Sequence, residues 1–582
     1  MSLKQKIFYL FISFLLLTTA TCFLGRNYLL RSVFEKNIIN KLTKHGVFCK
    51  VENMYWVGYN QINFSNILFT DKNRDTLFIS DTILAKISFL AMLRNISPPS
   101  SLKMKNGSLV LPDSLLLSIH NFSMEESKFS CLFQLNNKIT RDTLGKFSSQ
   151  GIVNREQSFC KIKVYQETSS KLTLPLWSGA TLSMDSMIVS VKLMPSPKDV
   201  KRTETALNFY NFKIFNKHLS SQECVFEKIQ YLLNVHLNHN TLYIENPSWI
   251  KINDITFNLT GEIKKEPALQ IKTTIQTEQL PAGKFFNSLP VGLFSVSRST
   301  KAEGLLNYFL RIGLDLSHTD SLLFESELKK ENFRIKNFGK ANFPSLNEPF
   351  YYTGHSKGFP DRKILVGQEN PDFVSLENIS NYLKNAVLIS EDGSFFFHDG
   401  FNEDAFRQSI ITNLKNKKFQ RGGSTITMQL VKNIYLSREK TISRKLEEIL
   451  LVWLLENSHA VSKERLYEIY LNIIEWGPDV FGISEASKFY FSKKPINLNL
   501  QESLFLSSII PRPKNFKYYF DKKGMLREFL KEYYAFVSEK LLIKELITSA
   551  EFENLKPEIK LTGPAKFLVM PQDSLPLDSL ND

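Results

Sequence analysis

The sequence predicts a multidomain protein with an N-terminal transmembrane helix, a long antiparallel β-rich region and a mostly α-helical C-terminal domain. Three patterns predict these parts: an uncharged run at residues 7–25, short alternating runs from about 45 to 345, and helical periodicity from 376 to about 545. A chain of 582 residues is long enough for roughly three to four domains of ordinary size. Its 43% hydrophobic and 23% charged residues are typical of globular proteins and exclude a mostly disordered, collagen-like or polytopic membrane chain.

Residues 7–25 predict a membrane anchor. These nineteen residues carry no charge, whereas lysines precede them and arginines follow. As a helix they would span roughly 28 Å, about the thickness of the hydrocarbon layer. A cleaved signal peptide is the alternative, but the run is long for one and lacks a good small-residue cleavage site. We therefore predict a cytoplasmic stub at 1–6, a single signal anchor, and the remaining chain outside the cytoplasm.

Residues 26–350 predict an extended β-rich region outside the membrane. Runs such as 76–80, 108–111 and 252–257 alternate apolar and polar residues, and turn residues recur about every ten positions. The histidines of this region are scattered, and the five cysteines of the chain are widely spaced. Neither a catalytic cluster nor a metal site nor a disulfide framework is therefore predicted here.

The opening of the β-rich region, NQINFSNILFTDKNRDTLFISDTI at 60–83, resembles the AsmA-like envelope proteins, whose strands form long lipid-facing grooves. The resemblance implies that residues 26–350 contact lipid or an envelope partner. Because no titratable cluster appears in the region, we expect it not to take part in catalysis.

The remaining boundaries come from composition. Glycines and prolines cluster at 351–375, which predicts a linker. Helical patterns then define a domain at 376–545. The segment 546–582 has four prolines after position 556 and little periodicity, so we expect a frayed C-terminal tail.

The net charge of +15 has two interpretations. One is a lysine-rich solvated surface, and the other is contact with nucleic acid, lipid headgroups or a phosphorylated substrate. The stretch 411–446 contains nine Lys or Arg residues and one acid. The predicted anchor argues against nucleic acid, so phosphate is the anion that such a cluster favours.

Two motifs hold polar residues at predicted helix ends. Glu391 and Asp392 follow an apolar helix, and His398 comes soon after; solvated acids at a helix terminus are the alternative to a site. In RGGSTITMQLVKN at 421–433, a glycine turn enters a helix with Ser424 as a candidate cap, and free backbone N–H groups there suit an anion. The spacing of a P-loop is missing.

Two further motifs follow. RKLEE at 444–448 opens an apolar run, and Arg444 and Glu448 share one helix face. A surface ion pair would contribute only about 0.3–0.5 kcal/mol, but beside a helix that is apolar all round the pair should be partly desolvated. Residues 462–511 predict a helix, a glycine-containing turn and a second helix, with Asn499 and Glu502 as a capping box.

Together the four motifs resemble the family 51 glycosyltransferases, which are the transglycosylase domain of class A penicillin-binding proteins and the monofunctional peptidoglycan glycosyltransferases. The pattern E-D-x-x-F-x-x-H-x-G matches at 391–400, G-G-S-T-I-x-x-Q-L-x-K-N at 422–433 and R-K-x-x-E at 444–448. NIIEWGPDVFG at 472–482 is especially similar to the monofunctional enzymes. The matching segment, about 376–515, is roughly a quarter of the chain, and four motifs in order are a specific signal.

The resemblance implies a lysozyme-like helical lobe with a second lobe that dips into the membrane. The implied reaction polymerises lipid II into β-1,4 glycan strands for the bacterial cell wall, with inversion and release of a lipid diphosphate. Glu391 would be the general base, and Glu448 would hold a basic cluster or a divalent ion in place. No cofactor is required by this scheme, and a divalent cation (Mg or Mn) stays open. The implied substrate-binding residues are Phe395, His398, Ser424, Thr425, Gln429, Lys432, Asn433, Lys440, Arg444 and Lys445.

Three residues depart from the family pattern. Met428 stands where Gln is usual, Lys440 where Arg is common, and Gln408 where a basic residue often follows the first motif. None of these changes touches Glu391 or Glu448, so activity is expected, with substrate affinity open to change.

The implied partners are lipid II, the lipid-linked glycan chain, the bilayer and other cell-wall synthesis proteins, with a single-pass location in the bacterial inner membrane. A lysozyme-type hydrolase or lytic transglycosylase is one alternative, but its sugar leaving group needs an acid and has no use for so many cations. A non-enzymatic envelope scaffold or lipid-handling protein with a degenerate transglycosylase domain is the other.

Overall fold

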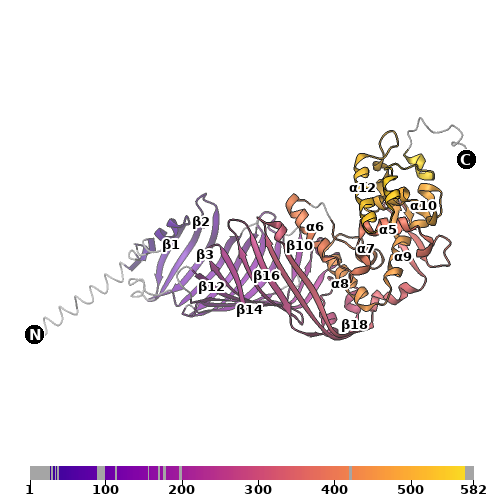
Figure 1. Cartoon of the computed structure of the whole chain (residues 1–582). Coiled ribbons are helices and arrows are strands. Elements are labelled where there is room, and N and C mark those ends of the chain that lie inside the picture. The colour runs from indigo at the N-terminus through magenta and orange to yellow at the C-terminus, as the bar shows by residue number, and fades with distance from the viewer. Residues whose placement is uncertain are drawn as a thin grey trace, which may run out of the picture. The chain divides into compact units, whose positions relative to one another are not determined.

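The computed structural model describes residues 13, 26–27, 30–32, 34–35, 39–87, 99–111, 115–154, 156–167, 171–174, 179–195, 200–418 and 422–569. The chain divides into two compact units (Figure 1). The β unit is Met1–Glu278 with Pro290–Gly292, and the helical unit is Gln279–Leu289 with Leu293–Asp582. A large antiparallel β-rich region followed by a mainly helical domain is thereby confirmed.

Among the described residues, no helix combines the length and apolar character needed to cross a bilayer. The predicted anchor at 7–25, of which only Ser13 is described, lies outside this part of the chain.

The β unit is built almost entirely of strands that lie side by side (Figure 1). Its elements are α2 (Asn40–Lys44), β1 (Phe48–Val57), β2 (Gln61–Thr70), β3 (Thr76–Lys86), β4 (Ser101–Leu111), β5 (Leu115–Glu125), β6 (Lys128–Asn137), β7 (Thr143–Asn154), β8 (Phe159–Gln166), β9 (Leu172–Leu174), β10 (Ala180–Ser183), β11 (Ser186–Met194), β12 (Val200–Phe215), β13 (Cys224–Asn238), β14 (Thr241–Ile252), β15 (Ile255–Lys264) and β16 (Gln270–Thr277).

The strands form an antiparallel meander. Strands β1 to β8 pair in sequence order, β8 pairs with β11, and β11 to β16 again follow in order, while the short β9 and β10 pair with each other and β10 also pairs with β12. Two-residue turns join several neighbours, as between Asn238 and Thr241, where His239 takes φ 47°. Positive φ at the first turn position matches the twist of such hairpins.

One face of this sheet carries two apolar rows that run across the strands. Residues directly opposite each other on neighbouring strands lie on the same face. The first row is Trp56, Ile62, Ala85, Leu102, Met124, Phe129, Gly151, Ile162, Val189, Leu207, Tyr231, Ile250 and Phe257. The second row is Met54, Phe64, Ile83, Met104, Phe122, Cys131, Ser149, Val164, Met187, Phe209, Ile229, Ile252 and Ile255.

The row between them points to the other face and is mostly polar. It includes Lys103, Ser123, Ser130, Gln150 and Lys163. Most apolar-row side chains are only half-buried, so the described residues leave much of the apolar face uncovered.

The helical unit begins with a β-hairpin and short helices before the long helices follow. Its first elements are β17 (Leu280–Pro281), α4 (Ala282–Asn287), the 3₁₀ helix η3 (Ser297–Ser299), β18 (Lys301–Asp315), η4 (Thr319–Ser321), β19 (Leu323–Asn337), η5 (Gly339–Ala341), η6 (Phe343–Asn347), β20 (Phe350–Gly354), β21 (Arg362–Val366) and η7 (Leu376–Asn378). The rest are α5 (Asn381–Glu391), η8 (Phe395–Phe397), α6 (Glu403–Asn416), α7 (Ile426–Tyr435), α8 (Ile442–Ser458), α9 (Lys463–Ile473), β22 (Glu475–Gly477), β23 (Val480–Phe481), α10 (Gly482–Phe491), η9 (Pro495–Asn497), α11 (Leu500–Ile509), η10 (Pro513–Tyr519), α12 (Glu528–Ile543), α13 (Ser549–Glu553) and η11 (Pro564–Leu568).

The core of the helical unit lies around α8 to α11. The side chains of α8 from Leu450 to Leu455 are all buried, as its run of apolar residues predicts, and Tyr490 of α10 packs edge-on against Phe505 of α11. The predicted capping box of Asn499 and Glu502 is present at the start of α11.

Two segments are more ordered than their composition suggests. Within the expected linker 351–375, β20 and β21 form a hairpin, and Arg362 makes a two-pronged ion pair with Glu485 of α10. Within the expected tail 546–582, Gly563 donates its N–H to the carbonyl of Tyr490. These contacts join residues far apart in the sequence, so local composition carries no signal for them.

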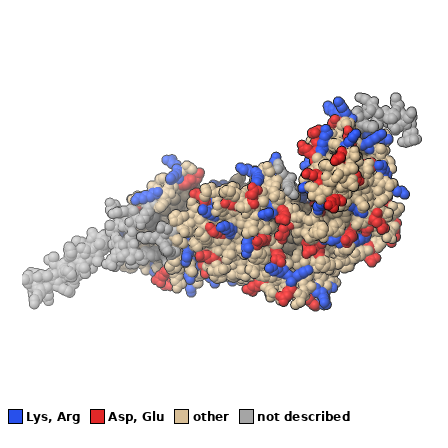
Figure 2. Space-filling model, in the orientation of Figure 1, with Lys and Arg blue, Asp and Glu red and all other residues tan. Residues whose placement is uncertain are grey.

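Positive and negative side chains are interspersed on both units over the face shown in Figure 2. The net charge of +15 is therefore not gathered into one large patch on this face.

Candidate active site

Glu391 stands at the last position of α5 and is held by Gln429 of α7. The Nε2 of Gln429 donates to Oε2 of Glu391 at 2.8 Å, and the Tyr470 hydroxyl from α9 donates to Oε1 of Gln429 at 3.2 Å. Because an ionised carboxylate only accepts hydrogen bonds, the amide must direct its nitrogen toward Glu391. Three helices therefore fix the Oε2 atom of this carboxylate.

The pKa of Glu391 is raised. Desolvation by burial is the main cause, and the negative charge of Asp392 adds to it, while the Gln429 hydrogen bond and the charge of Lys432 oppose it. A raised pKa brings a carboxylate nearer to the range in which a general base works best.

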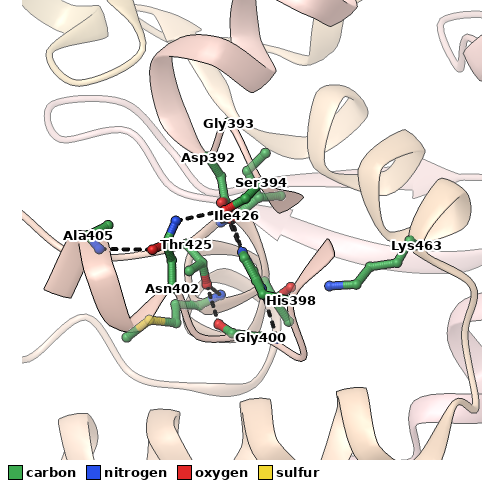
Figure 3. Close-up of polar contacts among 12 residues, drawn as sticks. Asp392, Gly393, Ser394, His398, Gly400, Asn402, Ala405, Thr425, Ile426 and Lys463 are labelled. Atoms are coloured by element: carbon green, nitrogen blue, oxygen red, sulfur yellow. Dashed lines mark hydrogen bonds and ion pairs between the residues drawn. The ribbon is translucent and has the colours of Figure 1, made fainter. Parts of the chain in front are cut away.

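Asp392 is buried and belongs to a clamp that joins the first and second motifs (Figure 3). Its carboxylate contacts Nε2 of His398 at 2.9 Å and accepts the N–H of Ile426, the first residue of α7, at 3.1 Å. His398 accepts the N–H of Gly400 on Nδ1, so Nε2 carries the proton that it shares with Asp392. Gly400 has φ +87°, and a Cβ there would lie 2.5 Å from Val452, so glycine is required at this position.

Thr425 completes the clamp and caps α7. Its hydroxyl donates to the carbonyl of Gly400 at 2.7 Å and accepts the N–H of Met428 at 3.2 Å. Thr425 rather than Ser424 is the N-cap, because its backbone is extended directly before the first helical residue. The clamp thus sets the position of α7, which carries Gln429 and Lys432, relative to Glu391.

Glu448 is a second buried carboxylate, on α8. It is 2% exposed and accepts Arg444 Nη1 at 3.0 Å and Lys445 Nζ at 2.6 Å. The predicted ion pair of Arg444 with Glu448 is therefore present and desolvated, and breaking a buried pair is costly because one charge remains unpaired.

A cleft of about 640 Å³ brings many of the predicted residues together. The predicted residues that line it are Gln429, Lys432, Asn433, Lys440 and Arg444. The pKa of Lys432 is lowered, first because the cleft desolvates its ammonium group and then because Arg444, Lys445 and Arg438 repel it, while Glu448 opposes this effect. Such mutual repulsion indicates a cluster built to receive an anion.

The two predicted catalytic residues, Glu391 and Glu448, and several other predicted residues lie outside the cleft lining. Phe395 is 1% exposed and packs behind the site against Tyr467, and His398 and Thr425 belong to the buried clamp. Ser424 is exposed before α7, and Lys445 binds Glu448.

The positions that depart from the family pattern fall in different surroundings. Met428 is 4% exposed and packs in the core, where an apolar side chain is suitable. Gln408 is exposed on α6, and only Lys440 lines the cleft.

Sequence reasoning missed several residues of the cleft. Tyr352 and His355 of the β20–β21 hairpin, Arg438 and Glu475 line it, and Arg438 donates to the His355 carbonyl at 2.7 Å. Arg438 belongs to the basic stretch and Glu475 to NIIEWG, so both carried a signal. The hairpin residues carried none, because their approach depends on contacts far apart in sequence.

The donor set does not fit a divalent cation at Glu448. Both of its carboxylate oxygens are occupied by cationic side chains. Among the described residues, no group of three or more His, Cys, Asp or Glu side chains is arranged to hold a metal ion.

Comparison with known proteins accounts for this arrangement. A family model described as transglycosylase matches residues 361–533. Proteins named biosynthetic peptidoglycan transglycosylase are similar over the same part: 40% identical in Methylobacillus flagellatus, covering 28% of this chain and 72% of that protein, and 37% identical in Chromobacterium violaceum, covering 31% and 84%. The relative from Nitrosomonas eutropha is 43% identical and covers 28% and 69%.

The chain belongs to the transglycosylase family. Its peptidoglycan glycosyltransferase domain lies within the helical unit, and the resemblance drawn from the four motifs is confirmed. The strands β1 to β16 lie before the matched residues.

Proposed function

We propose that this protein polymerises lipid II into β-1,4 glycan strands and releases a lipid diphosphate, as a step of bacterial cell-wall synthesis. The observation that carries the proposal is the link between a desolvated carboxylate, Glu391, and a cation-lined cleft: Gln429, which lines the cleft, donates to Glu391, and the charge of Lys432 acts on it. The names of the relatives, which are biosynthetic peptidoglycan transglycosylases, support the same substrate class.

Glu391 is proposed as the general base. Its carboxylate takes the proton from the acceptor 4-hydroxyl, whose oxygen then attacks the anomeric carbon of the donor. The donor carbon–oxygen bond to the diphosphate breaks with inversion, and the electron pair leaves with the diphosphate. A positioned base contributes typically 10²–10⁴-fold to the rate, and a raised pKa favours this role.

The leaving diphosphate needs positive charge rather than an acid. Lys432, Lys440 and Arg444 line the cleft and supply it, while Glu448 keeps Arg444 and Lys445 in fixed geometry. Fixed charges aimed at a developing negative charge are worth most where water is excluded. Gln429 acts on Glu391 rather than on substrate in this proposal, because both ends of its amide are engaged.

The test is polymerisation of labelled lipid II by the purified full chain. Glu391→Gln keeps the shape and loses the base, so we expect glycan synthesis to fall by at least ~10²-fold while lipid II still binds. Glu464→Gln, an exposed glutamate on α9, should leave the rate unchanged. Polymerisation by Glu391→Gln at near the wild-type rate would show that the base is another group.

The remaining expectations of location and partners form part of the proposal. Envelope association follows from the relatives' role in peptidoglycan synthesis. We infer a single-pass inner-membrane location with the two units outside the cytoplasm, which would keep the enzyme beside its lipid-linked substrate.

A second candidate function belongs to the β unit. We infer that its apolar face contacts the aliphatic chain of a lipid. Two apolar rows, which run over roughly 60 Å at about 4.8 Å per strand, hold no charged side chain and are for the most part only half-buried. An aliphatic chain needs no hydrogen bonds, so it suits this surface better than a polar partner.

A further inference from the structure

The segment 293–349, named here the brace, lies before the residues that match the transglycosylase family, 361–533. It nevertheless packs with the helices of the helical unit. We propose that the brace positions α8 for catalysis and that Glu447 is the positioning residue through which it acts. This inference rests on the proposed function.

Glu447 is the main link between the brace and α8. It is 2% exposed, and its Oε2 accepts the N–H of Ser295 at 2.5 Å while its Oε1 accepts the N–H of Ser297 at 2.7 Å. The N–H of Val296 also points to Oε2, at 3.3 Å. The carboxylate thus satisfies backbone N–H groups at the N-terminus of η3, among them that of the buried Ser297.

Aromatic contacts join the brace to two helices of the active site. Phe343 is fully buried and packs edge-on against Tyr435, at the end of α7, with ring centres 5.4 Å apart. Phe333 of β19 packs against Trp453 of α8 at 5.2 Å. Both contacts lie on helices that carry cleft cations, Lys432 on α7 and Arg444 on α8.

Polar contacts continue beyond α8. Asn347 donates its side-chain N–H to the carbonyl of Ala460, and Arg465 of α9 donates to the carbonyl of Leu346, both at 2.9 Å. The brace is therefore fixed to α8 along its length and to the loop that follows it.

Glu447 and Glu448 are adjacent in α8 but bind different partners. Glu447 binds the brace, and Glu448 binds Arg444 and Lys445. Because helix geometry couples adjacent residues rigidly, a small shift of α8 at Glu447 moves Glu448 and both cations together. A displacement of about 1 Å at such a site is enough to lower a rate substantially.

The experiment is a double-mutant cycle in the full chain, with Glu447→Gln and Arg444→Ala, measured as kcat and KM for lipid II polymerisation. Glutamine keeps the size but brings an N–H against the brace donors. We expect Glu447→Gln to lower kcat about tenfold with KM changed less than threefold. If Glu447 acts through α8, Arg444→Ala should then cost less than threefold in the Glu447→Gln background, against at least tenfold in the wild type.

Val537→Ala, at a fully buried position of α12, is the control for lost stability. It should lower the melting temperature comparably and leave kcat within twofold. Where Glu447→Gln does not fold, Glu447→Asp keeps the charge with a shorter reach and replaces it in the cycle. If the fold-losses in kcat caused by Glu447→Gln and Arg444→Ala simply multiply in the double variant, the proposal is wrong. Absence of polymerisation by the wild-type chain would instead reject the proposed function.

Discussion

Gln429 connects the base to the rest of the helical unit. Burial and the charge of Glu391 raise the pKa of Tyr470 well above its ordinary value, so its hydroxyl keeps its proton and donates to Gln429. Gln429 in turn donates to Glu391. The groups that set the charge state of Glu391 are Asp392, Lys432, Gln429 and Ser390, and the buried hydroxyls of Tyr467, Tyr470 and Tyr533 feel its charge.

Removal of the hydrogen bond from Gln429 to Glu391 should shift the pH dependence of catalysis. Gln429 stabilises the ionised form of Glu391, so its loss raises a pKa that is already raised. The base must be ionised to act, so the acidic limb of the kcat/KM profile should move to higher pH. A hydrogen bond to a charge is worth about 1.5–3 kcal/mol, or roughly one to two pH units.

We therefore expect Gln429→Met to move the acidic limb upward by roughly one to two units, and Tyr470→Phe to move it less in the same direction. The measurement is the pH profile of lipid II polymerisation. Gln222→Met, at an exposed glutamine of the β unit, is the control. A lower rate with an unmoved limb would mean that Gln429 binds substrate instead.

Helices α7 and α8 present the cations as a set. Lys432 and Arg444 line the cleft, whereas Lys417 and Lys418 at the end of α6 are exposed and do not line it. A charge-assisted bond to the leaving group is worth about 1.5–3 kcal/mol, which is roughly 10–200-fold in rate. Loss of Arg444 also leaves buried Glu448 with one cation fewer.

Lys432→Ala and Arg444→Ala should each lower kcat/KM at least tenfold at about 0.15 M salt. Replacing Lys417 and Lys418 together by Gln should change it less than about threefold, since exposed charges are screened. Titration with lipid II at two salt concentrations separates a local contact from a general field. If kcat/KM falls equally in the cleft variants and in the variant that lacks Lys417 and Lys418, the positive charge serves a membrane surface.

Local patterns in the sequence predict the helices and their caps better than the long-range contacts that hold these helices in place. The cap of α11 and the buried run of α8 depend on residues three to seven positions apart, so capping rules and periodicity predict them. The contacts of Glu447 with residues 295–297 span about 150 positions, and no local rule encodes them. For the same reason no local rule predicts the contact of Asp392 with the N–H of Ile426, 34 positions further along the chain.

The boundary between the two compact units differs from the boundary that the composition of the sequence predicts. The hairpin of β18 and β19 has strand composition, which places it with the predicted region 26–350, yet it packs with the helical unit. Composition reports the type of element, and packing decides the unit to which it belongs. The β unit is then a sheet with one apolar face, and binding of lipid to this face can be tested on the full chain.

Lipid binding by that face should depend on which side of one strand pair is changed. Phe122 and Phe129 belong to the apolar rows and stack with ring centres 6.2 Å apart, whereas Ser123 and Ser130 are the next residues along the same strands and pair on the polar face. Two glutamates in place of Phe122 and Phe129 would put charge into the path of an aliphatic chain, which is strongly unfavourable without a partner. Two glutamates in place of Ser123 and Ser130 bring the same charge to the solvated side, directly opposite each other, so cross-strand repulsion is at least as strong in this control. We expect a photoactivatable phospholipid to label the wild-type chain and the serine pair variant equally, and the phenylalanine pair variant at least fivefold less, with similar melting temperatures for both. Equal labelling of the two variants would mean that lipid binds elsewhere, and that the apolar face serves only to hold the strands together.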